Sequence, residues 1–194
     1  MCSSDLILPV QRPYPPLWYA GGTESAAQAG FNFVTRSAAD VTRYWQLWEE
    51  SRGHPGRFNG HLDCPKVGIT RHVVVRESYE EAVAIARRSW PVFESHWFAT
   101  PIALSEDGRA APAQPTPGGF DFDNAMAEDR RLLVGTPEMV RERLLTWLDE
   151  FSGRPSFYFS PAIQWGDITT LEAEETLRLL ARDVMPALVA RQQQ

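Results

Sequence analysis

The sequence predicts an α/β fold of parallel βα units, four of which would make half of a (β/α)8 barrel. The alternation of two kinds of segment indicates this fold. Short segments of apolar, β-branched or aromatic residues alternate along the chain with segments whose apolar residues recur every three to four positions. This alternation is typical of parallel sheets, because a helix returns the chain to the start of the next strand. The right-handed crossover rule then lays the helices on the outer side of a curving sheet.

Four segments have the composition of buried strands. The first two are short and apolar, the third contains a run of β-branched residues, and the fourth is rich in aromatic residues. We expect the four strands to lie side by side and to point the same way. They cover residues 17–20, 31–34, 66–75 and 156–160.

Five helices are predicted between and after these strands. Each begins with a hydroxyl residue that can accept a hydrogen bond from an amide of the first turn. Two of these starts, at residues 78–81 and 169–172, also have the form of a capping box. The predicted N-cap residues are Thr23, Ser37, Ser78, Thr136 and Thr169.

The interiors of the helices allow two more predictions. Pro91 is expected to kink or divide the third helix, and the last helix is expected to end at Val184, ahead of Pro186. In the second helix, large apolar residues recur with helical spacing, which predicts a buried face. That face consists of Val41, Tyr44, Trp45 and Trp48.

Residues 99–126 show no periodicity and are rich in proline and glycine. A loop of this length is uncommon in a compact domain unless it has a function. Its end, Asp121–Asn124, resembles the start of a calcium-binding loop but lacks the glycine and glutamate that complete one. We interpret this end as a solvated loop or a helix cap.

The composition is that of a globular protein. The chain has 194 residues, of which 43% are hydrophobic and 23% charged, and it is predicted to form one domain, residues 1–194. The net charge of −6 is dispersed, which disfavours nucleic-acid binding. No apolar run approaches the ~18 residues that a membrane span needs. Cys2 and Cys64 form no disulfide framework, so we predict a cytoplasmic location.

The first predicted strand is followed by a turn that could bind an anion. Gly21, Gly22 and Thr23 stand where the strand ends and a helix begins. Binding groups collect at the carboxyl ends of parallel strands, and the amides of a helix N-terminus suit phosphate. The glycines permit close backbone approach, and Thr23 and Ser25 add hydroxyl groups. The same glycines could equally serve turn geometry alone.

The remaining candidate residues do not define a catalytic site. His54, His61, His72 and His96 lack the companions of a zinc motif, so no metal site is predicted. His72 lies within a strand, and its ring could face either the barrel interior or the helix layer. Trp165 follows the last strand, where it could line a pocket or cover the barrel end. No nucleophile, general acid or general base is identified.

Three segments resemble the bacterial-luciferase-like flavin monooxygenase family, and they occur in the order of that family. The first resembles its Q-R-P-x-P-P-x-W entry to strand five, the second its G-[ST]-P-E-x-V helix start, and the third its closing helix, which ends in [ED]-V-M-P. In this chain they read "PVQRPYPPLWYAGGT", "VGTPEMVRERL" and "ETLRLLARDVMPAL". Together they span nearly the whole sequence.

The resemblance implies a TIM (β/α)8 barrel of which this chain is the C-terminal half, about strands five to eight. It also implies oxidation of a small organic substrate with O2 and reduced FMN, or a related deazaflavin. Residues 99–126 would correspond to the family's lid-like insertion over the active site. The flavin phosphate would be bound by Gly21, Gly22, Thr23 and Ser25.

Two departures from the family pattern modify these expectations. Strands one to four are absent, and the connection from Gly22 to Gly30 is shorter than a parallel crossover usually is. Half a barrel exposes two sheet edges, so we expect a homo-oligomer or a complementary N-terminal half as partner. We expect the isolated chain to bind FMN poorly and not to turn over. The alternatives are a non-catalytic flavin-binding or heterodimer subunit, and a plain α/β interaction domain.

Overall fold

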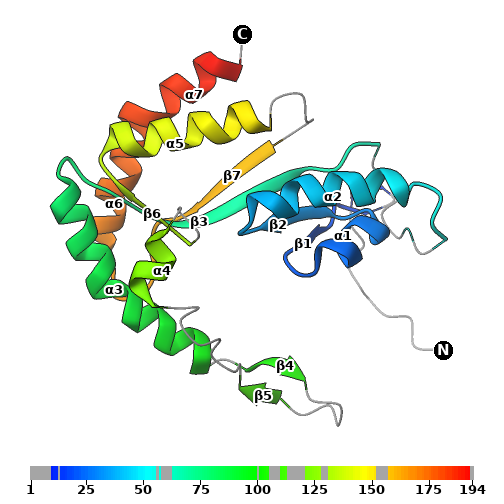
Figure 1. Ribbon diagram of the computed structural model, residues 1–194, viewed down its shortest axis with the longest axis horizontal. Coiled ribbons are helices and arrows are strands. Elements are labelled where there is room, and N and C mark those ends of the chain that lie inside the picture. Colours follow the sequence, from blue (N-terminus) through cyan, green and yellow to red (C-terminus); the bar gives the residue numbers. More distant parts are fainter. Residues whose placement is uncertain are drawn as a thin grey trace. The chain divides into compact units, whose positions relative to one another are not determined.

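The structure is a computed structural model that describes residues 10–12, 14–55, 57, 63–99, 101–104, 110–112, 121–127, 131–151 and 157–192 (Figure 1). The chain forms two compact units. The first consists of residues 1–69 and 154–159, and the second of residues 70–153 and 160–194. Two strands run from one unit into the other, so the predicted single domain stays a prediction.

The first unit contains three neighbouring parallel strands. Trp18 pairs with Asn32, and Phe33 pairs with Val67, in parallel register. The last strand of the chain, β7, also pairs with β3. The predicted parallel arrangement of the first three strands is therefore confirmed. The elements are β1 (Trp18–Tyr19), α1 (Thr23–Ala29), β2 (Asn32–Thr35), α2 (Ala38–Glu50) and the beginnings of β3 (Val67–Val75) and β7 (Phe157–Ala162).

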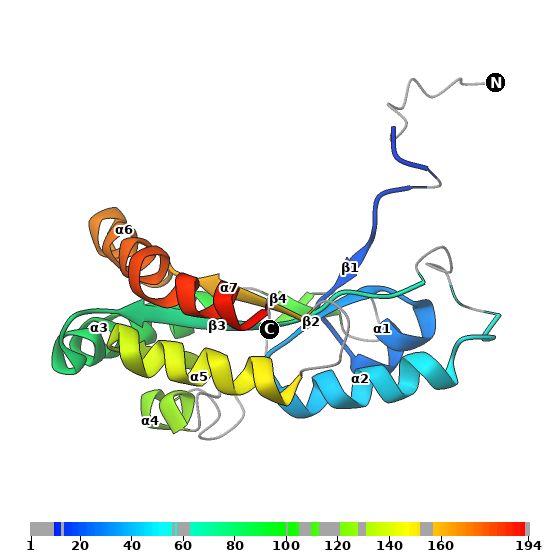
Figure 2. The same ribbon diagram turned by 90° about the horizontal axis from the view of Figure 1, so that it is seen from above.

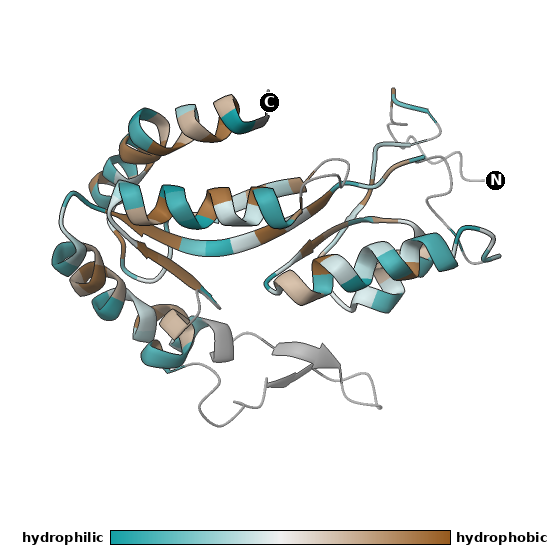
Figure 3. Ribbon diagram, turned by 45° about the horizontal axis from the view of Figure 1, so that its top comes forward, coloured by the Kyte–Doolittle hydropathy of each residue, from teal (hydrophilic) through white to brown (hydrophobic). Residues whose placement is uncertain are grey.

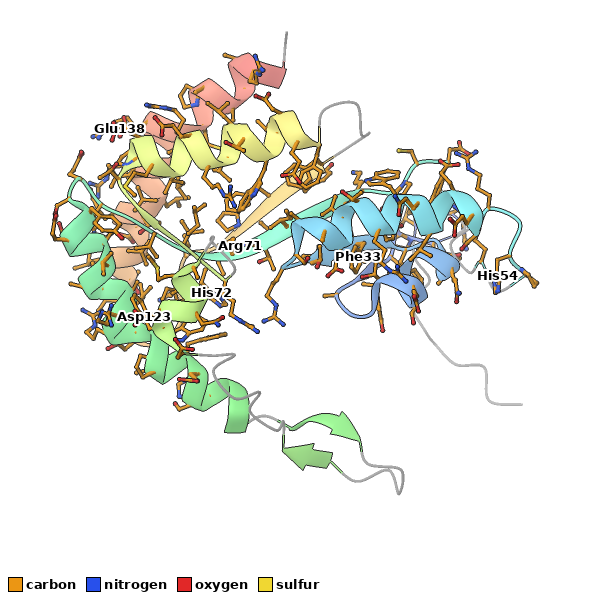
Figure 4. The ribbon with its side chains drawn as sticks, viewed as in Figure 1. Phe33, His54, Arg71, His72, Asp123 and Glu138 are labelled. Atoms are coloured by element: carbon orange, nitrogen blue, oxygen red, sulfur yellow. The ribbon has the colours of Figure 1, made fainter. Side chains whose placement is uncertain are left out.

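Helix α2 covers one face of this small sheet. The ring of Phe33 stacks on that of Tyr44, with centroids 5.1 Å apart and planes 9° apart, and Phe33 is labelled in Figure 4. In the hydropathy colouring of Figure 3, α2 has both hydrophilic and hydrophobic segments. Its predicted buried face is confirmed, since all four of its members are buried: Val41, Tyr44, Trp45 and Trp48.

The short connection between β1 and β2 still makes a parallel crossover. Helix α1 has only seven residues, and Gly30 ends it in the left-handed conformation, with φ of 73°. The amide of Phe31 then donates to the Ala26 carbonyl, at 3.0 Å. A glycine at this position reverses the chain without strain. The brevity of the segment therefore does not prevent β1 and β2 from pairing.

The second unit contains a strand that the sequence did not predict. Residues 72–75 of β3 pair in parallel with β6 (Leu132–Gly135). Helix α3 (Tyr79–Ala99) connects onward from β3, and α5 (Pro137–Glu150) follows β6. Arg71 lies over the Trp147 ring of α5, 5.0 Å from its centroid, whereas His72 contacts α3. Helices therefore cover both faces of β3, which differs from the expected single outer layer.

The extra strand explains this difference. The chain leaves β3 through α3 to reach β6, and it returns through α5 to β7, a second neighbour of β3. Each connection requires its own helix on its own face of the strand. Most of the core on the α3 side is apolar. It consists of Val74, Ala82, Ile85, Ala86, Trp90, Ala125, Leu132, Val134, Trp165, Ile168 and Ala173.

Most predicted helix starts are confirmed. The side chains of Ser37, Thr136 and Thr169 each accept a first-turn amide, and Thr169 with Glu172 completes a capping box. Ser78 accepts the Glu81 amide at 3.4 Å. The prediction for Thr23 was wrong, because Gly22 is the N-cap of α1 and makes no side-chain cap hydrogen bond.

The prolines do not end the helices as predicted, and a kink at Pro91 stays a prediction. Pro91 lies inside α3, which continues through it as one helix. The chain also remains helical beyond Val184, because α6 (Thr170–Leu179) passes through a π-helical turn, Leu180–Val184, into α7 (Met185–Gln192), as Figure 2 shows. A proline lacks the amide of a normal helical bond, and a wider π-turn next to Pro186 accommodates that loss.

The predicted loop at residues 99–126 lies mostly outside the described residues. Its described parts include an antiparallel pair, β4 (Pro101–Leu104) with β5 (Ala110–Pro112), and the short helix α4 (Phe122–Met126). Asp121 caps α4 by accepting the Asn124 amide at 2.8 Å, which confirms its interpretation as a cap. A function as a lid stays a prediction. Within the described ranges, no helix has both the length and the hydropathy that crossing a membrane takes.

Candidate functional site

The turn after β1 brings the four predicted phosphate-binding residues together. Gly22 has extended backbone angles, φ −65° and ψ 130°, and its carbonyl accepts the first bond of α1, from the Ala26 amide at 3.0 Å. The amides of residues 23–25 precede that bond, so they point out of the helix end. Gly21, Gly22 and Ser25 are exposed, and Thr23 is half-buried.

The two glycines of the turn have different surroundings. A Cβ at Gly21 would come within 2.5 Å of the Tyr19 ring, whereas a Cβ at Gly22 would meet only the Ser25 hydroxyl, at 3.8 Å. A side chain at Gly21 would therefore displace the ring of Tyr19, which is the exposed end of a flexible side chain. Gly22 faces open space, so the backbone at the helix start is accessible to a ligand.

Charged side chains surround this turn. Glu24, in the first turn of α1, forms an ion pair with Arg43 of α2, which offsets its repulsion of an anion. Arg36 directly follows β2, the strand that pairs with β1. Burial lowers the pKa of Arg36 from its ordinary value, although much of its surface is exposed.

Sequence reasoning missed Arg36. It is the first residue after β2, at the same carboxyl edge of the sheet as the glycine turn. A guanidinium is well suited to bind phosphate oxygens. The signal was present in the sequence, because an arginine that directly follows a buried strand of a parallel sheet stands on the edge where ligands bind.

The second unit brings His72 and Trp165 together. The His72 ring lies 5.3 Å from that of Trp165, 5.9 Å from Trp90 and 4.3 Å from Phe93. The imidazole is half-buried within this aromatic cluster, and Figure 4 shows Arg71 beside it on β3. His72 thus faces α3 and the loop after β7, and this contact with Trp165 favours a packing role for both residues.

A network of polar contacts holds the loop that carries Trp165. Gly166 has φ of 60°, and a Cβ there would lie 2.2 Å from the Ser89 carbonyl oxygen. Asp167 accepts hydrogen bonds from the Ser89 hydroxyl and from Arg88 Nε, at 3.1 Å. Bonds from Ser89 and Arg88 lower the pKa of Asp167. The loop is therefore fixed against α3.

The same network includes the start of α6. Arg88 Nη2 donates to Glu172 Oε2 at 2.9 Å, and this bond is the main cause that lowers the pKa of Glu172 to about 2. Thr169 contributes further hydrogen bonds to Glu172. The carboxylate is engaged as a helix cap and an ion-pair partner, so the network stabilises the fold and does not supply a proton donor.

The other residues singled out in the sequence are dispersed. His54 and His96 are exposed on separate elements, and His61 lies outside the described residues. Cys64 is a free, exposed thiol whose pKa burial raises. In the part of the chain that the structure describes, no group of His, Cys, Asp and Glu side chains could hold a metal ion.

Comparisons with known proteins identify the family of this chain. The model of the luciferase-like monooxygenase family matches residues 4–152, and this chain belongs to that family. A relative in Sinorhizobium fredii, the uncharacterized protein y4wF, is 28% identical over 169 residues. That alignment covers 84% of this chain and 46% of the relative.

Solved structures of similar fold have low sequence identity. Monooxygenase RslO1 from Streptomyces bottropensis is 22% identical with a TM-score of 0.56, and the match covers 91% of this chain and 49% of RslO1. The oxygenating constituent of 3,6-diketocamphane monooxygenase from Pseudomonas putida, solved with FMN, is 18% identical with a TM-score of 0.56, over 89% and 49% of the two chains. The chain thus spans about half the length of these relatives.

Proposed function

We propose that this chain is part of a flavin-dependent monooxygenase that oxidises a small organic substrate with O2 and reduced flavin. The observation that carries the proposal is the family match over residues 4–152. In the proposed enzyme the reduced flavin supplies the oxygen chemistry, and the protein binds, orients and shields it. We further propose that the strands correspond to strands five to eight of the family's barrel.

We propose FMN as the flavin, with a deazaflavin as the alternative. A likeness to one protein solved with FMN supports this choice, and so does a riboflavin lyase, RcaE, solved with modified FMN and riboflavin, which has a TM-score of 0.53 at 18% identity. Both cofactor types carry a phosphate group on the ribityl chain. At one edge of its sheet, the first unit has groups that suit a phosphate ligand. They are exposed backbone amides, two hydroxyl groups and a guanidinium.

In the proposed site, the flavin phosphate is held by Gly21, Gly22, Thr23 and Ser25, with Arg36 as a fifth contact. The amides at the start of α1 point out of the helix end, and the accessible backbone at Gly22 lets an anion approach them. The ion pair with Arg43 partly neutralises the carboxylate of Glu24. Hydrogen bonds from a guanidinium to a phosphate are charge-assisted, and such bonds are about twice as strong as neutral ones.

Comparison of FMN with riboflavin tests this site, because riboflavin lacks only the phosphate. Fluorescence titration of the full chain should show weak, reversible binding, with FMN favoured over riboflavin by about tenfold, the effect of one charge-assisted contact. Thr23→Ala with Ser25→Ala, and separately Arg36→Gln, should reduce that preference. Arg178→Gln, an exposed arginine of α6, is the matched control and should leave it unchanged.

The outcomes separate the alternatives. Equal affinity for FMN and riboflavin would exclude the proposed phosphate site. No flavin binding at all would favour a plain α/β interaction domain, and binding without oxidation of any substrate in the fully assembled protein would favour a non-catalytic subunit. Tight stoichiometric binding by the monomer would contradict the expectation that this chain alone holds flavin poorly.

A further inference from the structure

Four residues of the first unit meet at the amino ends of its strands. Trp18 and Asn32 are the first residues of β1 and β2, and they pair in register. Lys66 directly precedes β3, and its backbone amide donates to Asn32 Oδ1 at 2.8 Å. The centre of the Tyr158 ring lies 5.9 Å from that of Trp18 and 5.5 Å from the Lys66 ammonium. We call Trp18, Asn32, Lys66 and Tyr158 the amino-edge site.

Asn32 has a buried hydrogen-bond donor without an acceptor. The residue is 1% exposed. Because a backbone amide donates to Oδ1, the other end of this side chain is its NH2 group. Nδ2 has no hydrogen-bond partner among the described residues. Buried donors in proteins are nearly always satisfied, so this one indicates a position for an acceptor that the described chain does not supply.

The second polar group of the site is also a donor. Lys66 is the only lysine in the sequence, and it is exposed. In the part of the chain that the structure describes, its ammonium lies over the Tyr158 ring and forms no ion pair. An ammonium has three donor hydrogens and no acceptor. The complementary group of a ligand is therefore an acceptor, and the positive charge favours an anionic oxygen.

Two exposed rings form the apolar part of the site. Trp18 is 46% exposed and Tyr158 is 41% exposed, although both side chains are large and aromatic. They meet edge to face, with planes 87° apart. Aromatic rings bind other rings by offset stacking or by edge-to-face contact. The rings therefore favour a ligand with a planar aromatic body.

We propose that the amino-edge site binds a planar aromatic carboxylate. Its ring packs on Trp18 and Tyr158, and its carboxylate accepts hydrogen bonds from Lys66 Nζ and Asn32 Nδ2. The exposed indole of Trp18 moves aside to admit the carboxylate to the buried amide. A bound water would satisfy the amide but would leave the rings exposed and the ammonium without a counter-charge. The inference goes beyond the proposed function, because the glycine turn stands at the opposite, carboxyl edge of the sheet.

Labelling of the single lysine tests the proposal with cinnamate as the probe. Reductive methylation of the full chain with isotope-labelled formaldehyde marks Lys66 and the terminal α-amino group and keeps both positive charges. Cinnamate should shift the Lys66 methyl signal saturably and leave the α-amino signal unchanged. Cinnamamide, the uncharged analogue, should bind about tenfold more weakly, because its contact with Lys66 has a neutral acceptor. Cyclohexanecarboxylate should also bind more weakly, since it has no planar ring, and FMN should not compete.

Calorimetry with the unlabelled chain compares variants of the site. Lys66→Gln should remove the preference for cinnamate over cinnamamide. Trp18→Leu should weaken the binding of both ligands about fivefold, the effect of one aromatic contact. Asn32→Ala should weaken the binding of cinnamate about tenfold through the lost hydrogen bond. Arg178→Gln is the matched control, because it also removes an exposed positive charge, and it should leave both affinities unchanged.

Far-UV circular dichroism checks the folding of each variant. If Asn32→Ala does not fold, Lys66→Gln and Trp18→Leu still decide the question. The proposal is overturned by the absence of saturable binding, which would leave water as the occupant, and by equal affinities for cinnamate and cinnamamide. It is also overturned if Lys66→Gln binds cinnamate as tightly as the wild type does. Competition by FMN would assign these residues to the flavin and would likewise exclude a separate site.

Discussion

Replacement of Gly166 by alanine tests whether the loop after β7 is held as the structure shows. The residue has φ of 60°, and an added Cβ would lie 2.2 Å from the Ser89 carbonyl oxygen and 3.0 Å from its carbonyl carbon. A left-handed conformation costs a non-glycine residue about 1–2 kcal/mol. Displacement of a close-packed backbone adds about 1–3 kcal/mol. The expected total loss of stability is therefore about 2–5 kcal/mol.

Urea unfolding, followed by tryptophan fluorescence and circular dichroism, measures this loss. Gly53→Ala is the matched control, because no heavy atom lies within 4 Å of a Cβ placed there, and it should change stability by less than about 1 kcal/mol. Near-UV dichroism should also change for Gly166→Ala, since Trp165 would move relative to His72. A Gly166→Ala protein as stable as the wild type would show that the loop does not pack on α3 in this way.

Two further predictions concern the polar network and the glycine turn. Because the folded pKa of Glu172 is lowered from 4.5 to about 2, its contribution is present above pH 4.5 and is lost as the pH falls towards 2. With solvent screening this contribution is about 1–2 kcal/mol, and Glu172→Gln should flatten the stability profile in that range. Gly22→Ser should stabilise the protein by a few tenths of a kcal/mol, roughly the gain of a capping side chain. Gly21→Ser should instead destabilise it by about 1 kcal/mol through displacement of Tyr19; equal effects at the two glycines would contradict the different surroundings that we describe.

Local patterns in the sequence predicted the local structure well. The hydroxyl residues Ser37, Thr136 and Thr169 cap helices because a capping bond involves only neighbouring residues. The spacing of Tyr44 and its neighbours in α2 identified the buried face for the same reason. Parallel pairing of the first strands also followed from the alternation of segments, since a helix between two strands returns the chain to the start of the next strand.

Structure that depends on distant contacts was not predictable. Strand β6 has only four residues and directly precedes the N-cap of α5. Its sequence therefore does not distinguish it from the segment that leads into a helix, and only its pairing with β3 identifies it as a strand. The ring of His72 could have faced either side, and only the contacts with Trp90 and Trp165 decide this. The π-turn before Pro186 likewise has no local signal.

Two arginines at strand ends illustrate why position alone does not define a site. Arg76 follows β3 and is 4% exposed. Its guanidinium donates to the Thr176 hydroxyl and the Glu172 carbonyl, both at 2.9 Å, and so joins β3 to α6. A buried charge needs such partners, and a ligand could reach it only by breaking them. Arg36 follows β2 and is exposed at the carboxyl edge of the sheet that also carries the glycine turn, and for this reason we propose Arg36, and not Arg76, as a contact of the anion.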